Sequence, residues 1–325
     1  MKKALIVSLL LLAWVPGRCQ FFRNVDDWLM RRQARQVYDT TYIYRPQTRW
    51  LVRTKSFFFG ENITLIAGGG EAGANGYGFR IGNGFNYKQT IGGGYRNLAF
   101  DVGFMPFGKR SSADFSIKVY GNRIGVKAEG ALCYGFSGRA TALGHSYDVK
   151  PGDVVAMYGM VNAYYAFNGG RFSMPAAMTQ SYFQRRSAGS LLAVVSVRAM
   201  PVTVLDEAIR EMQMERAFCA LAGAGLGYGY NWVPSRHWLV HACLNETVGI
   251  WNAAAMSIQG YEKEFRRESP IFVTAGSFAL LYYYRKWYFG MYADFDNMLF
   301  LGEDKLSMIM GRTKSSANLT VGIRF

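Results

Sequence analysis

Long hydrophobic runs are missing from most of this 325-residue sequence. Beyond residue 19, the longest uncharged stretch extends from Ala217 to Ser235, and it contains four glycines at alternating positions as well as Pro234. Each glycine in a helix interior costs about 1 kcal/mol relative to alanine, so this stretch does not predict a transmembrane helix. If the chain crosses a membrane, strands must carry it, because lipid does not tolerate unpaired backbone groups.

Cysteine and histidine are scarce, with four and three copies. Cys133, Cys219 and Cys243 lie beyond the N-terminal leader, and an odd number does not suggest a disulfide scaffold, so we expect free thiols. His237, His241 and Cys243 share one face of a predicted strand, but residues two or four apart on a strand are separated by about 7 to 13 Å, too far for one metal ion. The sequence therefore predicts no metal site and no cofactor.

Dense basic tracts are absent too, although 37 Lys and Arg residues against 22 Asp and Glu residues give a net charge of +15 at pH 7. Three interpretations compete: nucleic-acid binding, attraction to anionic headgroups, or solubility alone. The basic residues are scattered and the chain carries an export signal, which argues against nucleic acid. We expect contact with anionic lipids or sugars of the outer membrane, lipopolysaccharide included.

Residues 1–19 have the pattern of a secretory signal peptide. Lys2 and Lys3 precede an uncharged apolar run of twelve residues, and small residues at Gly17 and Cys19 predict cleavage before Gln20. The run is too short to span a bilayer as an anchor. Lipidation of Cys19 is the alternative, and Arg18 is a poor residue just before a lipidated cysteine.

Beyond residue 50, apolar and polar residues alternate with a period of two, which predicts β-strands. The second half of the chain repeats the alternation of the first half. The clearest strands are expected at 77–88, 97–104, 114–119, 124–137, 218–232, 237–245, 287–296 and 317–325, and weaker ones at 61–68, 154–167, 188–199 and 271–284. The sequence therefore predicts twelve strands.

Charged residues lie on the polar face of these strands, at positions far from the strand ends. A soluble β-sandwich needs a dry core, whereas a membrane barrel directs apolar side chains to lipid and charged ones to a wet lumen. The fold class predicted is all-β, an antiparallel transmembrane β-barrel of about 12 strands in the cell outer membrane. Its expected lumen-lining residues include Arg80, Asp101, Lys127, Glu129, His241, Asp294 and Arg324.

The connections between the predicted strands alternate in length, as short periplasmic turns and long external loops do in such barrels. Short connections fall at 121–123, 233–236 and 285–286, and long ones at 139–153, 200–217, 252–270 and 299–313. One connection disagrees, because 168–187 is long where a short one is expected. Two aromatic girdles support the same orientation. Their outward-facing members are predicted to be Trp232, Trp238, Tyr284, Trp287 and Phe325 near the periplasm, and Phe104, Phe136, Phe218, Phe272 and Phe295 near the other end.

Residues 20–49 form a separate N-terminal segment, and 50–325 the barrel. Asn24 can cap a short helix whose first turn is acidic and whose last turn is basic, as the helix dipole favours. We expect a periplasmic tail packed on the barrel mouth, with a plug inside the lumen as the alternative.

Several strings resemble an uncharacterised family of Bacteroidota outer-membrane β-barrel-like proteins, a domain of unknown function. They are DTTYIYRP, YGFRIGNGFNYK, GYRNLAFDVGF, YGNRIG, QRRSAGS, GYGYNW and the closing VGIRF. The resemblance extends from about Asp39 to Phe325 and implies a barrel and a compartment, with no catalytic residues to carry over. The aromatic Phe325 on an alternating last strand also resembles the signal that the barrel-assembly machinery recognises.

Two classes of function are compatible with such a barrel. A narrow solute conduit or a structural envelope protein is the first, because the inward charges nearly balance and open porins use about 16 to 18 strands. The alternative is an outer-leaflet lipid- or glycan-modifying enzyme, for which His145, Ser146 and Asp148 in an external loop are the candidates. Neighbours in sequence rarely align for proton transfer, so an enzyme is the less favoured hypothesis.

The alternating glycines Gly223, Gly225, Gly227 and Gly229 predict a hollow in the lumen wall. We expect any ligand groove there, lined by Arg80, Lys127 and His241. No helix follows the glycines, so they are no nucleotide-binding loop. A hairpin turn centred on 234 and 235 would place Cys243 opposite Leu226, too far from Cys219 for a disulfide.

Overall fold

The computed structural model describes residues 24, 26–31, 37–67, 77–105, 112–142, 144–211, 215–258, 261–266, 271–303 and 307–325. The chain divides into two units, Met1–Val37 and Tyr38–Phe325. In the first unit, residues 26–31 are helical and Leu29 is buried. The predicted leader at 1–19 lies outside the described residues. Among the described helices, none is long and apolar enough to cross a membrane.

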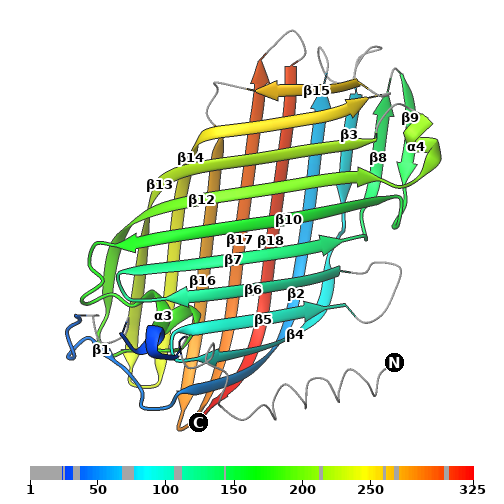
Figure 1. Ribbon diagram of the computed structural model, residues 1–325. Helices are drawn as coiled ribbons and strands as arrows, with labels where there is room; N and C mark the ends of the chain where they lie inside the picture. Colours follow the sequence, from blue (N-terminus) through cyan, green and yellow to red (C-terminus); the bar gives the residue numbers. More distant parts are fainter. Residues whose placement is uncertain are drawn as a thin grey trace. The chain divides into compact units, whose positions relative to one another are not determined.

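The second unit consists almost entirely of strands (Figure 1). Its elements are β1 (Ile43–Tyr44), β2 (Trp50–Ala67), β3 (Tyr77–Gly82), β4 (Asn86–Tyr95), β5 (Leu98–Phe104), β6 (Ser112–Tyr120), β7 (Ile124–Cys133), β8 (Ser137–Ala142), β9 (His145–Val149), β10 (Val154–Ala166), α3 (Met174–Met178), β11 (Phe183–Gln184), β12 (Ala188–Val204), α4 (Glu207–Glu211), β13 (Arg216–Ser235), β14 (Trp238–Ile258), β15 (Tyr261–Arg266), β16 (Phe272–Tyr284), β17 (Trp287–Glu303) and β18 (Ser307–Arg324).

Twelve of these strands form a closed antiparallel barrel. Neighbouring strands pair in the order β2, β4, β5, β6, β7, β10, β12, β13, β14, β16, β17 and β18, and β18 pairs with β2 along seventeen residue pairs to close the ring. Backbone hydrogen bonds in both directions between Trp50 and Phe325 fasten the two ends of the chain (3.0 and 3.1 Å). The strands of the front wall cross those of the back wall in Figure 1. The predicted twelve-strand antiparallel barrel is confirmed.

Most strands are longer than predicted at one end of the barrel. We call this end, where β2–β3, β5–β6, β7–β10, β12–β13, β14–β16 and β17–β18 are connected, the long-loop end. The expected loop 139–153 contains the β8–β9 hairpin, and β12, β14 and β17 extend into the other expected loops. The opposite end, with two- or three-residue turns at 96–97, 121–123, 236–237 and 285–286, is the short-turn end.

A register shift separates β3 from β4, although both pair with β2. Gly82 lies opposite Asn62, whereas Asn86 lies opposite Phe59, so three residues face two across the break. Gly84 adopts a positive φ of 65° there. One extra residue inverts the alternation of the strand that precedes it, because side chains alternate with a period of two.

This inversion corrects the prediction for Arg80. The interpretation of 77–88 as one strand placed Arg80 in the lumen with Lys88. In the structure Phe79 and Ile81 are buried inward, and Arg80 is exposed on the opposite face, paired in register with Arg139 of β8. Arg80 therefore does not line the lumen.

The hairpin β13–β14 has a different register from the predicted one. Ser235 pairs with Trp238, and Cys243 lies opposite Gly229 instead of Leu226. The predicted register was wrong because the turn lies at 236–237, two residues beyond the predicted centre at 234 and 235. Cys133, Cys219 and Cys243 are free and buried.

The outer face of the ring is apolar on every strand. Each of the twelve strands exposes at least one large apolar side chain, and we call this surface the apolar belt. One member from each strand, in ring order, is Val52, Ile91, Phe100, Ile117, Ile124, Val161, Val195, Leu226, Leu244, Phe278, Met291 and Leu319.

Nine of the ten predicted girdle aromatics are exposed. Five of them are exposed at the short-turn end: Trp232, Trp238, Tyr284, Trp287 and Phe325. Four are exposed nearer the long-loop end: Phe104, Phe218, Phe272 and Phe295. Phe136 is fully buried, because the chain turns inward between β7 and β8 and adds it to a cluster inside the barrel.

Candidate functional site

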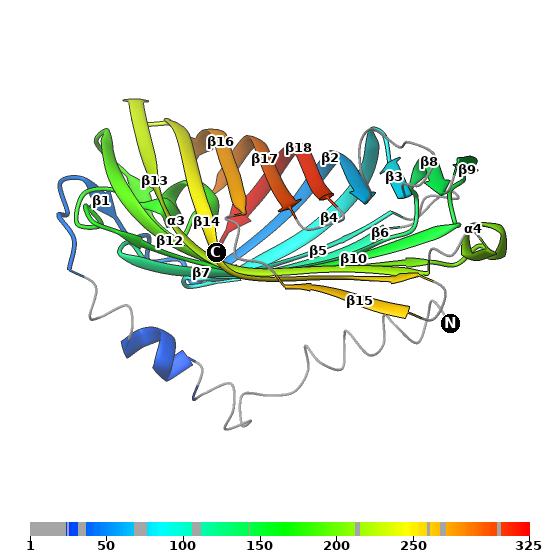
Figure 2. The ribbon, with the colours of Figure 1, turned by 90° about the horizontal axis from the view of Figure 1, so that it is seen from above.

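A plug fills the barrel interior at the short-turn end. It consists of Tyr38–Tyr44 and the connection 168–187, which holds α3 and pairs β11 with β1 (Figure 2). Ser173 caps α3 by accepting a hydrogen bond from the Ala176 backbone (3.3 Å). Ile43, Ala176, Ala177 and Tyr182 are fully buried against inward residues of β2, β14, β16 and β17. The long connection that contradicted the predicted loop pattern is therefore this plug.

Polar contacts anchor the plug to the wall. The Asn231 amide donates to the Ser173 carbonyl (2.9 Å), and the Tyr283 hydroxyl donates to the Ala176 carbonyl (3.1 Å). Gln180 donates to the Tyr292 hydroxyl (2.6 Å). The plug is held by hydrogen bonds from barrel side chains in addition to apolar packing.

An apolar cap fills the interior at the long-loop end. Its side chains come from opposite walls of the ring and from the β8–β9 hairpin, so they meet across the barrel. Members include Ile63, Leu65, Phe79, Ile81, Phe136, Val149, Val154, Met200, Val202, Leu221, Ile271, Val273, Met298 and Met310. This end of the lumen is therefore packed like a protein core.

Between the plug and the apolar cap lies a polar cavity of about 240 Å³, which we call the central chamber. Met174 and Met178 of the plug border it on one side, and Tyr158 and Met160 border it on the other. Its charged lining residues are Arg53, Lys55, Lys118, Lys127, Arg312 and Lys314, with Asp101, Asp114, Glu129, Asp294 and Asp296.

Asp101 is the centre of one group of ion pairs in the chamber wall. Arg53 binds both of its carboxylate oxygens (2.7 and 2.8 Å), and Lys55 donates to one of them (2.9 Å). Lys118 lies 3.5 Å from the same carboxylate. Arg53 also contacts Gln180 of the plug (3.3 Å), so this group joins the wall to the plug. Three cations share one buried carboxylate, which leaves this side of the chamber positive.

A second group of ion pairs lies nearer the apolar cap. Glu129 pairs with Lys127 and with Lys314 (3.0 Å). Arg198 donates to Asp296 (2.6 Å), and Arg312, which pairs with Glu61, approaches Asp296 at 3.5 Å. The pairs Lys314–Glu129 and Arg198–Asp296 join strands that are not neighbours in the ring, so these two pairs cross the lumen and brace it.

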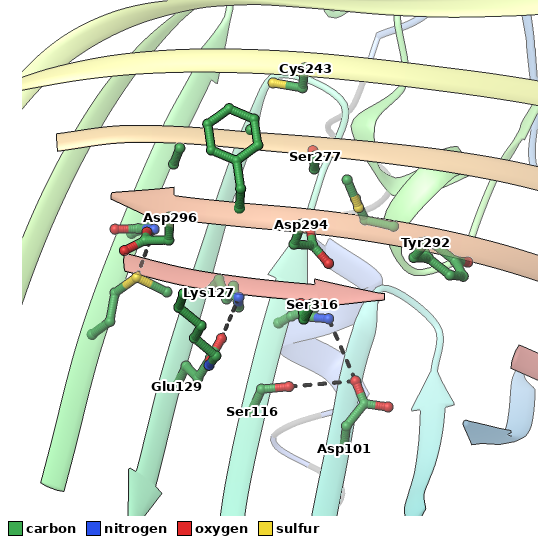
Figure 3. A pocket seen from close by; sticks show the side chains of 18 of the residues that line it. Asp101, Ser116, Lys127, Glu129, Cys243, Ser277, Tyr292, Asp294, Asp296 and Ser316 are labelled. Carbon is green, nitrogen blue, oxygen red and sulfur yellow. Dashed lines mark hydrogen bonds and ion pairs between the residues drawn. The ribbon is translucent and has the colours of Figure 1, made fainter. Parts of the chain in front are cut away.

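Asp294 faces the chamber without an ion pair of its own among those found in the described part of the chain. Figure 3 shows Asp294 and Ser316, from β17 and β18, across the chamber from Lys127, Ser116 and Asp101. Asp101, Lys127, Glu129 and Asp294 therefore line one space.

His241 points inward but lies beneath the plug. Its Nδ1 is 2.7 Å from the Asn231 side-chain oxygen, and its ring stacks on Phe172 at 6.2 Å between centroids. A Cβ added to Gly229 would lie 2.8 Å from the Phe172 ring. Phe172 therefore fills the hollow at Gly229, and with Arg80 outside and Lys127 in the chamber the predicted ligand groove does not form.

Arg324 is buried beside the plug among aromatic rings. Its guanidinium lies 4.1 Å from the Phe183 centroid and 5.5 Å from that of Tyr283. Cation–π attraction of this kind is stronger where water is excluded. Arg324 thus belongs to the junction of the last strand with the plug and does not line the chamber.

The candidate catalytic residues lie on β9. His145 and Ser146 are neighbours on a strand, so their side chains point to opposite faces. Asp148 is exposed and lies 3.7 Å from Arg139. The local geometry does not bring these residues together for proton transfer. Among the described residues, no cluster of His, Cys, Asp and Glu could hold a metal ion.

Sequence reasoning missed five charged residues of the chamber region. They are Arg53, Lys55, Glu61, Arg312 and Lys314, of which all but Glu61 lie beyond the predicted ends of their strands. The signal was present, because the inward positions of the last strand, counted back from Asn318, give 316, 314 and 312.

Comparisons with known proteins give one family match. The family model described as "Domain of unknown function (DUF4421)" matches residues 71–325. No curated protein is significantly similar to the chain.

Three solved structures with a related arrangement are distant from this chain. The outer membrane protease OmpT from Escherichia coli has 6% identity and a TM-score of 0.41, with 87% of this chain and 98% of that chain covered. The Pseudomonas putida toluene transporter TodX has 8% identity and a TM-score of 0.33, covering 86% and 91%. A Pseudomonas aeruginosa FadL homologue has 9% identity and a TM-score of 0.30, covering 85% and 90%. Similarity of this degree carries no argument about function.

Proposed function

The chain belongs to the DUF4421 family, whose description names no activity, and we propose that it is an integral outer-membrane β-barrel with a closed lumen. The apolar belt is the observation that carries this proposal. Soluble monomers rarely expose contiguous apolar patches above a few hundred Å², whereas lipid accommodates such a surface. Short turns lie on the periplasmic side in barrels of this type, so the short-turn end faces the periplasm.

The sequence supplies the remaining parts of this proposal. Residues 1–19 act as the cleaved leader, 20–49 as the N-terminal segment, whose residues Tyr38–Tyr44 belong to the plug, and 50–325 as the barrel. Phe325 completes the last strand and presents the terminus that the barrel-assembly machinery reads. From the resemblance to Bacteroidota proteins we expect the chain to come from a bacterium of that group. We expect lipopolysaccharide to surround the long-loop end.

Closure of the lumen follows from three consecutive layers. The plug fills the interior at the short-turn end, and the ion pairs of the central chamber and the apolar cap each contain side chains from opposite walls. An open porin instead keeps an aqueous channel through about 16 to 18 strands. At rest, this barrel therefore serves as a closed envelope protein.

A narrow solute conduit is the second candidate function, and the central chamber favours it. Charged side chains inside a barrel need water around them or partners. The chamber has room for a small polar solute, but passage would require the plug to move. The enzyme hypothesis receives no support from the geometry of β9.

Planar-bilayer recordings of the mature chain test this proposal. We expect almost no steady conductance from the unmodified barrel. Replacing residues 172–182 with a Gly-Ser segment of equal length should produce a stable conductance, because it removes α3 and its anchors. Heat-modifiable electrophoretic mobility shows that each variant is a folded barrel.

Two outcomes would contradict the proposal in different ways. A large steady conductance of the unmodified barrel would show that the lumen is open. Recovery of the folded mature chain in the soluble fraction, without detergent, would refute the membrane location.

A further inference from the structure

Basic residues edge the short-turn end all around the barrel. The four short turns carry Arg96, Arg123, Arg236 and the pair Arg285 and Lys286. The remaining chain segments at this end, the approach to β2 and the connection 168–187, carry Arg45, Arg49, Arg171, Arg185 and Arg186. Asp39 is the one acidic residue in these segments. We call the basic residues of the four turns, together with Arg49, the basic rim.

The basic rim lies beside the aromatic side chains that face outward. The Arg96 guanidinium lies 5.5 Å from the Tyr95 ring centroid, and that of Arg285 lies 5.5 Å from the Tyr284 centroid. Tyr95 in turn contacts the exposed Trp50 (4.6 Å between centroids). These positive charges are therefore held at the outer circumference, next to the apolar belt.

Two rim arginines occupy a backbone conformation that disfavours them. Arg96 and Arg285 have φ values of 56° and 54°, each at the first residue of a two-residue turn. Glycine or asparagine adopts this left-handed region with less strain. Folding alone would favour a different residue at both positions, which points to a separate role for the charge.

We propose that the basic rim binds the phosphate groups of anionic phospholipids in the periplasmic leaflet. This inference rests on the proposed membrane location. A ring of charge around the circumference matches a lipid leaflet, which surrounds the barrel, better than a protein partner, which docks on one side. Arginine suits phosphate because its planar guanidinium donates two parallel hydrogen bonds. Interfacial aromatic rings place the arginines at headgroup depth.

Tryptophan fluorescence offers a direct test, because four tryptophans lie at the short-turn end. Trp50, Trp232, Trp238 and Trp287 are exposed there, and Trp28→Phe with Trp251→Phe removes the other two of the mature chain. In vesicles that mix brominated phosphatidylglycerol with unbrominated phosphatidylcholine, and in the reverse mixture, quenching reports which lipid contacts the rim.

We expect phosphatidylglycerol to bind roughly threefold or more tightly than phosphatidylcholine, since basic residues near the membrane surface attract anionic lipids. Arg96→Asn, Arg236→Asn, Arg285→Asn and Lys286→Gln together should reduce the ratio to about one. Asparagine tolerates the positive φ, so this variant should fold.

The matched control neutralises basic residues at the long-loop end, with Arg139→Gln, Lys150→Gln and Arg210→Gln, and should leave the ratio unchanged. Equal quenching by both lipids in the unmodified barrel overturns the inference, and so does a preference that survives the rim substitutions. If the rim instead bound an acidic protein, both lipids would quench the tryptophans equally. Insertion into both vesicle types with no preference would refute the rim inference alone, whereas failure to insert would refute the membrane proposal.

Discussion

The two ends of this barrel are closed by different means. The short-turn end holds a plug anchored by hydrogen bonds and is edged by basic residues. The long-loop end is closed by side-chain packing alone, and its connections mix both signs, as in Asp206, Glu207, Arg210, Glu211 and Glu215 between β12 and β13. Between them lies the chamber of ion pairs.

This difference shows which end can move. An apolar cap that draws on strands of both walls and on the β8–β9 hairpin cannot be opened without loss of core packing. The plug is one connection plus Tyr38–Tyr44, and it is held by the apolar packing of these two segments and by individual hydrogen bonds of about 1 kcal/mol each. The plug is therefore the element that could be displaced while the ring stays intact. Three substitutions test how far the contrast holds.

The largest effect is expected in the apolar cap. Phe136→Ala should lower the free energy of unfolding by about 3–5 kcal/mol, because the side chain is fully buried and leaves a cavity. Urea unfolding in detergent micelles measures this loss. Phe85→Ala is the matched control, since Phe85 is 78% exposed and should cost much less. Equal losses at both positions would mean that the cap is not a packed core.

Asp101→Asn should have the next largest effect. It leaves Arg53, Lys55 and Lys118 beside a neutral amide, at a cost of about 3 kcal/mol in unfolding free energy, because breaking a buried pair strands the remaining charge.

The control for that substitution is Asp148→Asn at the long-loop end. Asp148 has an 81% exposed side chain and pairs with Arg139, so the loss should stay below about 1 kcal/mol. Similar values for both variants would show that water in the chamber screens the ion pairs as bulk solvent does.

The smallest effect is a gain in stability at the short-turn end. Arg285→Asn should raise the free energy of unfolding by up to about 1 kcal/mol, since asparagine relieves the positive φ. Arg236→Asn should give no such gain, because Arg236 is not among the residues with positive φ. A loss of stability in Arg285→Asn would indicate that the guanidinium contributes to folding, and would weaken the inference drawn from strain.

Most strands of the barrel can be predicted from the alternation of apolar and polar residues along the chain. Alternation in Phe115, Ile117 and Val119, against Asp114, Ser116 and Lys118, predicts both the strand and its two faces, because the backbone itself sets the period of two. The same rule predicted that Asp101, Lys127, Glu129 and Asp294 face the lumen, and they line one chamber. It failed for Arg80, where one extra residue at 83–85, next to Gly84 with its positive φ, inverts the faces.

The sequence alone determined the strands, their count and the faces of most side chains, since each depends on residues one or two positions apart. Tertiary structure decided which charges meet, as in Arg312 and Glu61, which lie 251 positions apart. It also decided that 168–187 folds inward as a plug and that scattered arginines gather at one edge. The physical reason is that these features depend on closure of the ring, which brings distant strands together after their local pattern is already set.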